Sequence, residues 1–540
     1  MKPLAYLLPL AIVVGPSASW AQDADPVGAI LAKYEAAGGP GCSVAASKNG
    51  ETVVSRRFGL ANLEHGVAIG PSTRFDIAST SKQFTAAAVL LLVQDGKLSL
   101  SDDIRTHLKE MPDHGSTITV DHLLVQTSGL RDYPFLTELQ GWWPEARRQH
   151  TNDELVALIA AQRELNFEPG ARWSYSNSNY VLAAEIVERV SGVSLREFLT
   201  KRIFEPLGMT STVLRDDHST LIPGQAGAYF GPPGELKRAV PASRYGDSNL
   251  VSTPEDLLIW NHALANERLG ALVSRELQRA GTASSGRTLS YARGLFVTQY
   301  KGHSEISHSG GSLGATAFSA RYPEHGFAVA MACNAMVPVE EVAHQIADLF
   351  LPKREEPTPA VAPQKAALLQ EQRQRLAGVY LDQDRGVRLT LSEREGVLML
   401  ANETATPVSS TVLRLSGSGQ RELVVEGAGA LTLRDLTTGI QRRLLRLDTV
   451  APSDDELASL KGRYRSSEIG TTYDVTPKAG GVVLQIADPQ LEWPVEAITR
   501  DVFDAGRDTI RFLRDANGRA TAFEISNARN RKVRFDRLED

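Results

Sequence analysis

The period of apolar and polar positions changes along the chain and divides it into blocks. In the first block, continuous apolar runs typical of buried strands stand at both ends, near residues 42–60 and 294–333. Between them, from about Ser79, apolar residues recur with helical spacing, and a further helical pattern covers 339–351. Strands at both ends of a helical interior predict one sheet, built from the two termini of the block and packed by helices.

A proline-rich stretch ends this block, because four prolines fall among charged residues from Pro352 to Pro363. It predicts a semi-rigid linker. Short alternating segments follow, such as residues 386–391, and they are typical of antiparallel strands. The run LAGVY at 376–380 returns as LKGRY at 460–464. We therefore predict two related antiparallel all-β domains, with barrels favoured over sandwiches.

The N-terminus has the pattern of a secretory signal. Lys2 precedes an apolar run over residues 4–14, and small residues follow as far as Ala21. The run is shorter than the ~20 residues needed to cross a bilayer, which argues against the alternative of a membrane anchor. We predict cleavage after Ala21 and a periplasmic or secreted protein that has no transmembrane segment once the signal is removed.

A chain of 540 residues is too long for one core. The predicted parts are a signal peptide at 1–21, an α+β domain at 22–352, the linker at 353–366, and β domains at 367–450 and 451–540.

The net charge and the cysteine and histidine content limit which partners and cofactors the sequence leads us to expect. A net charge of −6 gives no reason to expect nucleic acid or an anionic membrane surface as a partner. The two cysteines, Cys42 and Cys333, exclude a disulfide scaffold and a cysteine zinc site. Both stand in apolar runs, so we expect buried free thiols, with a disulfide between neighbouring strands as the alternative. The eleven histidines show no metal-ligand spacing, and we predict no metal and no cofactor.

Ser79 and Lys82 stand three residues apart where an apolar helical pattern begins. Residues at this spacing share a helix face, so the amine can take the proton of the hydroxyl. Backbone N–H groups at a helix start can also stabilise an oxyanion. Taken alone, the pair fits equally a serine that caps a buried helix and a lysine that extends to solvent.

Two later motifs contain residues that can act together with Ser79 and Lys82. Tyr175 and Asn177 lie on a loop rich in Ser and Asn. A tyrosine near an ammonium group has its anionic form favoured, and the asparagine can hold a substrate amide. His308 is followed by Gly310 and Gly311, where a backbone N–H can complete an oxyanion hole and the imidazole can meet a carboxylate or carbonyl. Taken alone, each motif also fits an ordinary turn.

Ordered as Ser-x-x-Lys, Tyr-x-Asn and His-x-Gly, the three motifs resemble the serine β-lactamase and penicillin-binding protein superfamily, in its branch of class C β-lactamases, D-aminopeptidases and esterases. Stretches at 96–100, 123–130 and 250–257 also look like this family. The resemblance covers the first block and implies a β-lactamase-like catalytic domain.

The resemblance also implies roles for seven residues. They are acylation at Ser79, proton transfer by Lys82 and Tyr175, substrate binding by Asn177, His308, Gly310 and Gly311, and an oxyanion hole from the N–H groups of Ser79 and Gly311. Which of Lys82 and Tyr175 is the base stays open.

Two residues depart from the family pattern. His308 stands where typical β-lactamases have lysine, which weakens the grip on a β-lactam carboxylate near neutral pH. Gln126 replaces the usual histidine. A catalytic domain followed by two β domains is similar to the D-aminopeptidase layout, in which lipocalin-like barrels follow and the last one shapes the active-site entrance. We identify no segment of the third block that must reach Ser79, and residues 488–494 are interpreted as a turn with a core tryptophan.

The leading hypothesis is an exported serine hydrolase that forms an acyl-enzyme and cleaves peptides containing D-amino acids, as a D-aminopeptidase or DD-peptidase does. A small peptide or ester is the expected substrate. The alternatives are a carboxylesterase or weak β-lactamase, and a non-catalytic sensor of cell-wall fragments. The natural substrate and the oligomeric state are not predicted.

Overall fold

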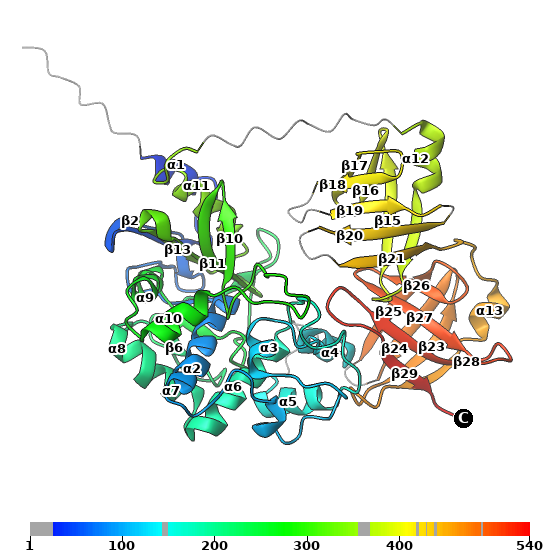
Figure 1. The fold of residues 1–540 in the computed structure, drawn as a ribbon, viewed down its shortest axis with the longest axis horizontal. Coiled ribbons are helices and arrows are strands. Elements are labelled where there is room, and N and C mark those ends of the chain that lie inside the picture. Colours follow the sequence, from blue (N-terminus) through cyan, green and yellow to red (C-terminus); the bar gives the residue numbers. More distant parts are fainter. Residues whose placement is uncertain are drawn as a thin grey trace, which may run out of the picture.

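The computed structural model describes residues 25–142, 149–354, 368–416, 421–427, 429–436, 440–487 and 490–539. The predicted signal at 1–21 and residues 355–366 of the predicted linker lie outside these ranges. A mixed α/β domain comes first and two barrels follow, with the second barrel lying against the first domain (Figure 1). No helix in the described ranges is long and apolar enough to cross a membrane.

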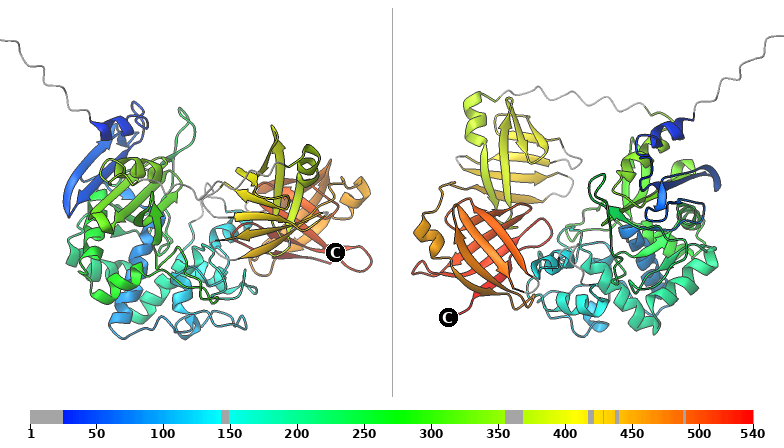
Figure 2. Two further views of the ribbon diagram at one scale, coloured as in Figure 1. Left: turned by 45° about the horizontal axis from the view of Figure 1, so that its top comes forward. Right: turned by 180° about the vertical axis from the view of Figure 1, so that it is seen from behind.

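The first domain is built on a six-stranded antiparallel sheet that joins its two ends, as predicted. Two strands from the start of the domain continue four from its end (Figure 2). In spatial order the strands are β10 (Phe296–Tyr300), β11 (His303–Ser312), β12 (Ala315–Tyr322), β13 (Phe327–Cys333), β1 (Cys42–Lys48) and β2 (Glu51–Phe58).

Helices cover both faces of this sheet. On one face α1 (Pro26–Leu31) and α11 (Val339–Ala347) close an apolar cluster with alternate residues of β12 and β13. The other face carries the helical middle of the domain: α2 (Lys82–Gln94), α3 (Val120–Leu124), α4 (Tyr133–Leu139), α5 (Asn152–Ala160), α6 (Ser178–Ser191), α7 (Leu195–Leu199), α8 (Glu205–Leu207), α9 (Pro254–Ala265) and α10 (Ala271–Gln278). The turn at 78–81 contacts β11 and β12, α2 packs against α6 and α10, and α9 packs directly on β13 and β1.

The cysteines are paired, so the expectation of free thiols is wrong. Cys42 lies opposite Cys333 in the antiparallel register of β1 and β13, with their Cα atoms 4.0 Å apart. Both side chains are buried and joined in a disulfide. The cause is register, because directly opposed residues of neighbouring strands come close enough for their side chains to bond.

Two closed eight-stranded antiparallel barrels form the rest of the chain, as the alternating segments predicted. The first consists of β14 (Gly378–Asp382), β15 (Arg388–Arg394), β16 (Val397–Leu400), β17 (Glu403–Pro407), β18 (Val412–Leu415), β19 (Arg421–Val425), β20 (Ala430–Asp435) and β21 (Gln441–Arg446). The second consists of β22 (Gly462–Arg465), β23 (Thr472–Lys478), β24 (Gly481–Ile486), β25 (Leu491–Ala497), β26 (Val502–Ala505), β27 (Asp508–Arg514), β28 (Ala520–Ser526) and β29 (Val533–Arg537).

The repeated LAGVY and LKGRY runs form the same structure in both barrels. Each follows a short helix, α12 (Gln370–Leu376) or α13 (Asp454–Ala458), and enters the first strand. The Tyr380 hydroxyl donates to the Leu376 carbonyl at 2.7 Å, and the Tyr464 hydroxyl to the Leu460 carbonyl at 2.9 Å. A buried tyrosine thus fixes the helix end against the strand in each copy.

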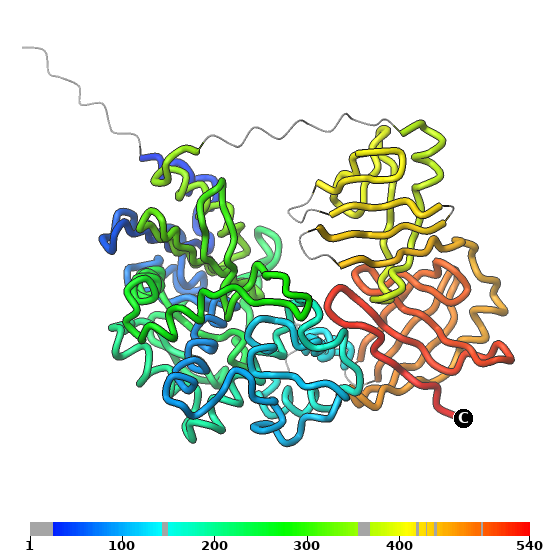
Figure 3. The backbone as a smooth tube through the Cα atoms, in the orientation of Figure 1, coloured from blue at the N-terminus to red at the C-terminus, as the bar shows by residue number. Residues whose placement is uncertain are grey.

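The second barrel shares a hydrophobic core with the first domain. Phe135, Leu136 and Leu139 of α4 are buried in the cluster that fills this barrel. Tyr473 of the barrel donates its hydroxyl to the Leu139 carbonyl at 3.0 Å. The backbone trace shows the β28–β29 hairpin directed toward the first domain beside α4 (Figure 3). This contact places a barrel loop at the site described next.

Candidate active site

Ser79 lies in a 3₁₀ turn, Ala78–Ser81, that leads into α2. The residue before it, Ala78, has a φ of +45°, which is a strained conformation for a residue other than glycine. The Asp76 carboxylate accepts the Ala78 N–H at 2.8 Å and helps to hold this turn. Ser79 is partly exposed in this turn, whereas Lys82, at the start of α2, is fully buried.

The Lys82 amine lies among three oxygen atoms. Its Nζ is 3.0 Å from Ser79 Oγ, 2.9 Å from Asn177 Oδ1 and 2.7 Å from the carbonyl oxygen of Asp247. The last two can only accept hydrogen bonds. A neutral amine that donates its two N–H groups to them has its lone pair directed to the Ser79 hydroxyl. The geometry therefore suits Lys82 as the base that removes the Ser79 proton.

Asn177 is held in its orientation by Asp132. The buried Asp132 carboxylate accepts both the Asn177 backbone N–H at 2.7 Å and its side-chain amide at 3.0 Å. The side-chain oxygen of Asn177 therefore faces Lys82. Burial raises the pKa of Asp132, while the Arg529 guanidinium and these N–H groups act in the opposite direction.

Gln126 fixes the loop that carries Tyr175 and Asn177. Its side-chain oxygen accepts the Ser176 N–H at 2.9 Å and the Asn179 amide at 2.6 Å. Gln126 itself adopts a φ of +63°. The residue that departs from the family pattern in sequence thus has a positioning role here.

Tyr175 presents its ring to two cations. Lys82 Nζ lies 4.9 Å from the ring centroid, and Arg529 Cζ lies 5.1 Å from it. Both distances are within the ~6 Å at which a cation interacts with an aromatic ring. A hydroxyl and an amine from one segment and the aromatic ring of Tyr175 from another thus lie at one place.

His308 is buried behind this group and both its ring nitrogens have partners. Nδ1 lies 2.6 Å from the Ser309 carbonyl, so it carries the proton, and Nε2 accepts from the Tyr291 hydroxyl at 3.1 Å. Burial, reinforced by the charge of Lys82, lowers the pKa of His308 to about 3. The imidazole is therefore neutral at physiological pH, and substrate contact by His308 stays a prediction.

The two glycines after His308 differ in their surroundings. A Cβ on Gly310 would lie 2.3 Å from the Ile77 carbonyl oxygen and 3.0 Å from the Ser79 nitrogen, so only glycine lets β11 approach the 3₁₀ turn this closely. A Cβ on Gly311 would meet nothing within 4 Å, and this residue is exposed. The open side of β11 thus lies at Gly311, where the oxyanion hole is predicted.

A loop of the second barrel reaches the site. Residues 527–532 join β28 to β29, and Arg529 lies 3.1 Å from the Asp132 carboxylate in addition to facing Tyr175. Asn530 accepts the Asp132 N–H at 2.7 Å. The buried Arg131 donates to the Arg531 carbonyl at 3.1 Å and pairs with Glu468 of the barrel at 2.9 Å. Of the stretch at 488–494, residues 488 and 489 lie outside the described ranges, and the rest leads into β25, where Trp493 packs against the barrel core.

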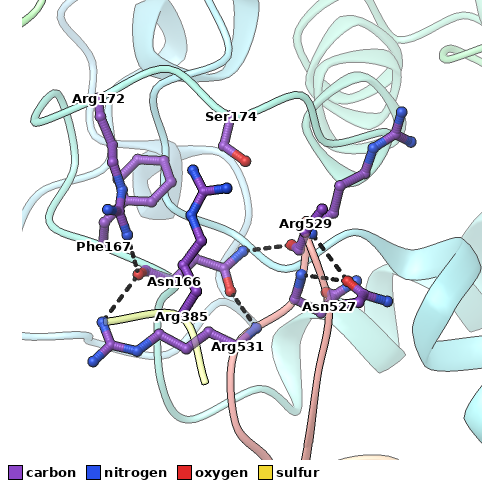
Figure 4. Close-up of a pocket in the computed structure, with 10 residues that line it drawn as sticks. Asn166, Phe167, Arg172, Ser174, Arg385, Asn527, Arg529 and Arg531 are labelled. Atoms are coloured by element: carbon purple, nitrogen blue, oxygen red, sulfur yellow. Dashed lines mark hydrogen bonds between the residues drawn. The ribbon is translucent and has the colours of Figure 1, made fainter. Parts of the chain in front are cut away.

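All three domains meet beside this loop (Figure 4). Asn166 donates to the Arg529 carbonyl at 2.7 Å and accepts the Arg531 N–H at 2.8 Å. Asp384 of the first barrel pairs with Arg172 at 2.6 Å and Arg531 at 3.2 Å. The cavity at this junction measures about 10 Å³, roughly one water molecule. It is a structural joint and too small for a substrate.

Sequence reasoning missed Asp132, Asp247 and Arg529. Asp132 lies two residues after the Thr-Ser-Gly-Leu stretch at 127–130, and an acidic residue so near this stretch is the signal that sequence reasoning overlooked. Asp247 acts through its backbone carbonyl, which no side-chain pattern reveals. Arg529 comes from a polar hairpin 450 residues after Ser79 in the numbering.

One group in the described ranges has side chains that suit a metal ion. Ligand atoms of His303, Glu324 and His325 lie within 4.8 Å of one another. They already have protein partners: His325 bonds to His303 at 2.8 Å, and Glu324 pairs with Arg354 at 2.8 Å. The absence of a metal stays a prediction.

Comparison with known proteins places these features in a family. The family model described as Beta-lactamase matches residues 28–351. A D-aminopeptidase of Gluconobacter oxydans is 28% identical over 82% of this chain and 83% of its own length. A D-aminopeptidase of Brucella canis is 25% identical over 93% of this chain and 96% of its own length, so the similarity extends through both barrels.

Among solved structures, the D-amino acid amidase from Ochrobactrum anthropi SV3 is 25% identical, with a TM-score of 0.52, and it covers 60% of this chain and 97% of that one. Together with the Ser79, Lys82 and Asn177 geometry, these matches identify the chain as a serine hydrolase. It belongs to the beta-lactamase family, within the superfamily of serine β-lactamases and penicillin-binding proteins.

Proposed function

We propose that this protein is an exported hydrolase of D-aminopeptidase type that forms an acyl-enzyme on Ser79 and cleaves peptides or amides of D-amino acids. The observation that carries the proposal is the position of Lys82 Nζ, 3.0 Å from Ser79 Oγ and anchored by Asn177 and the Asp247 carbonyl. The D-aminopeptidase relatives and the D-amino acid amidase support the substrate class.

The proposed acylation begins with transfer of the Ser79 Oγ proton to the Nζ lone pair of Lys82. Oγ attacks the substrate carbonyl carbon, and the N–H groups of Ser79 and Gly311 stabilise the oxyanion. The C–N bond then breaks, and the leaving nitrogen takes a proton from Lys82 or through the Tyr175 hydroxyl. Water hydrolyses the ester by the same steps in reverse, which releases the D-amino acid and restores Ser79.

The cation beside Tyr175 favours a second candidate, a DD-peptidase. His308 is neutral and gives no charge to bind a carboxylate, but the half-exposed Arg529 guanidinium does. A substrate with a free carboxylate gains from this cation, and one with a free ammonium is repelled. The esterase and β-lactamase alternatives lack a comparable observation.

The test compares three substrates and one label. D-alanyl p-nitroanilide, an acetylated D-Ala-D-Ala dipeptide and p-nitrophenyl acetate are offered to the protein, and intact mass is recorded after penicillin treatment. Turnover of the anilide supports the aminopeptidase, and preference for the dipeptide supports the DD-peptidase. Turnover of the ester alone points to an esterase. Ser79→Ala should abolish every activity and the mass increase; turnover that survives this change would refute the assigned nucleophile.

Export rests on the N-terminal pattern and is supported by the buried Cys42–Cys333 disulfide, which is typical of oxidising compartments. Expression of the full chain in a Gram-negative host, followed by fractionation and N-terminal sequencing, tests it. A periplasmic product that begins at Gln22 is expected. A cytoplasmic product that keeps residues 1–21 would contradict export.

A further inference from the structure

A second hollow lies away from the catalytic residues, at the end of the sheet where α9 and α10 cover β12 and β13. Its volume is about 780 Å³, within the range of about 300–1,000 Å³ typical of small-molecule sites. It is bounded by the turn after β1, by α9 and α10, and by residues 321–328. Ser79, Lys82 and Tyr175 do not line it.

Arg321 contributes a buried cation to this hollow. Its side chain comes from β12, on the sheet face that packs against α9, and the residue is 5% exposed. Nε and one terminal nitrogen are buried without a hydrogen-bond partner in the described part of the chain. Burial lowers the pKa of Arg321 to about 10, and no carboxylate opposes this effect. The guanidinium is therefore charged at neutral pH and has no counter-ion among the described residues.

A second polar group without a partner lines the same hollow from another element. The Ser274 hydroxyl of α10 is buried and makes no hydrogen bond within the described residues. Buried polar groups are almost always hydrogen-bonded, and an unpaired buried charge is especially costly. Two such groups from separate elements indicate a shared acceptor that the described residues do not supply.

The remaining lining defines the chemistry of that acceptor. Arg275 and Arg279 add positive charge at the rim, where they pair with Glu276, and Glu267 is the single carboxylate in the lining. Apolar parts of the lining come from Leu264, Ala265 and Ala328. A planar guanidinium fits carboxylate or phosphate oxygens in pairs.

We propose that this hollow is a binding site for a small organic anion, whose carboxylate or phosphate group is held by the Arg321 guanidinium and the Ser274 hydroxyl. The apolar walls would contact the organic part of the ligand. The site is separate from the acyl-enzyme chemistry, and its occupancy is measurable without turnover.

Thermal unfolding of the full chain, with inorganic phosphate or citrate as probe, tests the proposal. The Tm of the wild type should rise with probe concentration. Arg321→Met should remove that rise and weaken binding at least tenfold by calorimetry, while its Tm without probe stays at or above the wild-type value because an unpaired buried charge is gone. Arg321→Lys keeps the charge but loses the paired geometry, so it should bind with intermediate affinity. Comparison of the two probes distinguishes phosphate from carboxylate ligands.

Two control variants show at which site the probe binds when it raises the Tm. Arg238→Gln removes an exposed arginine elsewhere in the domain and should respond like the wild type. Arg529→Gln removes the cation beside Tyr175 and should also respond like the wild type. A response lost in Arg529→Gln and kept in Arg321→Met would place the probe in the catalytic site and overturn the proposal. No response of the wild type to either probe would overturn it as well. If Arg321→Met does not fold, Ser274→Ala, which should weaken binding of the same probes, decides the question.

Discussion

Gly310→Ala tests whether close contact between β11 and the 3₁₀ turn sets the position of Ser79. The added Cβ would lie 2.3 Å from the Ile77 carbonyl oxygen, whereas carbon and oxygen normally stay about 3.3 Å apart. The turn must therefore move by about 1 Å, because β11 is fixed opposite β12 by the pairing of Gly310 with Ala317. Ser79 moves with it, since its nitrogen is also only 3.0 Å from the new atom.

A displacement of about 1 Å costs roughly 100-fold in rate, which corresponds to about 2.7 kcal/mol of transition-state stabilisation. We expect kcat/KM on whichever chromogenic substrate the wild type cleaves to fall by this factor. Gly311→Ala, at a position open to 4 Å, is the control for folding and should keep the wild-type Tm. A Gly310→Ala enzyme with wild-type kcat/KM would refute the argument that this contact positions the nucleophile.

Three further predictions concern charge, covalent structure and pH. Arg529→Gln should lower kcat/KM about tenfold on a carboxylate-bearing substrate. Arg534→Gln, on the neighbouring strand β29, should leave kcat/KM unchanged. Equal effects of the two variants in steady-state assays would show that the Arg529 cation beside Tyr175 does not bind the substrate carboxylate. Replacing Cys42 and Cys333 by serine should cost about 2–4 kcal/mol of unfolding free energy, seen as a lower urea midpoint, and an unchanged midpoint would show that the bond is dispensable. The pKa of His308 is lowered from 6.5 to about 3 in the folded protein, so the unfolded chain binds more protons between these two pH values. The Tm should therefore fall as the pH drops from 6.5 toward 3. A Tm profile equally steep in His308→Gln would exclude His308 as the cause.

The sequence predicted the elements whose patterns are local. The strands at 315–322 and 327–333 lie within the region of 294–333 where strands were predicted, because turn residues separate two mainly apolar runs there. The two barrels were predicted from alternating segments and from the repeated sequence run that ends at Tyr380 in one copy and at Tyr464 in the other. The meeting of Ser79, Lys82 and Asn177 followed from motif order, since this order was already known to accompany one fold.

What the sequence did not predict depends on pairings between distant segments. Nothing in the runs around Cys42 and Cys333 specifies the register that places them opposite each other. Arg529 sits in a polar hairpin like many others, and its approach to Tyr175 depends on the docking of α4 into the second barrel. Arg321 lies within a fully buried strand, and its lack of a hydrogen-bond partner among the described residues depends on how the helices pack over that strand.

The sheet that joins both ends of the catalytic domain also determines the order in which the domain folds. β1 and β2 are adjacent in the chain and pair locally. The other neighbour of β1 is β13, whose last residue, Cys333, comes 291 residues after Cys42. Closing so long a loop is slow, because chain entropy is lost before the contact forms. Until β13 pairs with it, the apolar edge of β1 is open to association with other chains. Oxidation of Cys42 and Cys333 makes this long-range pairing covalent.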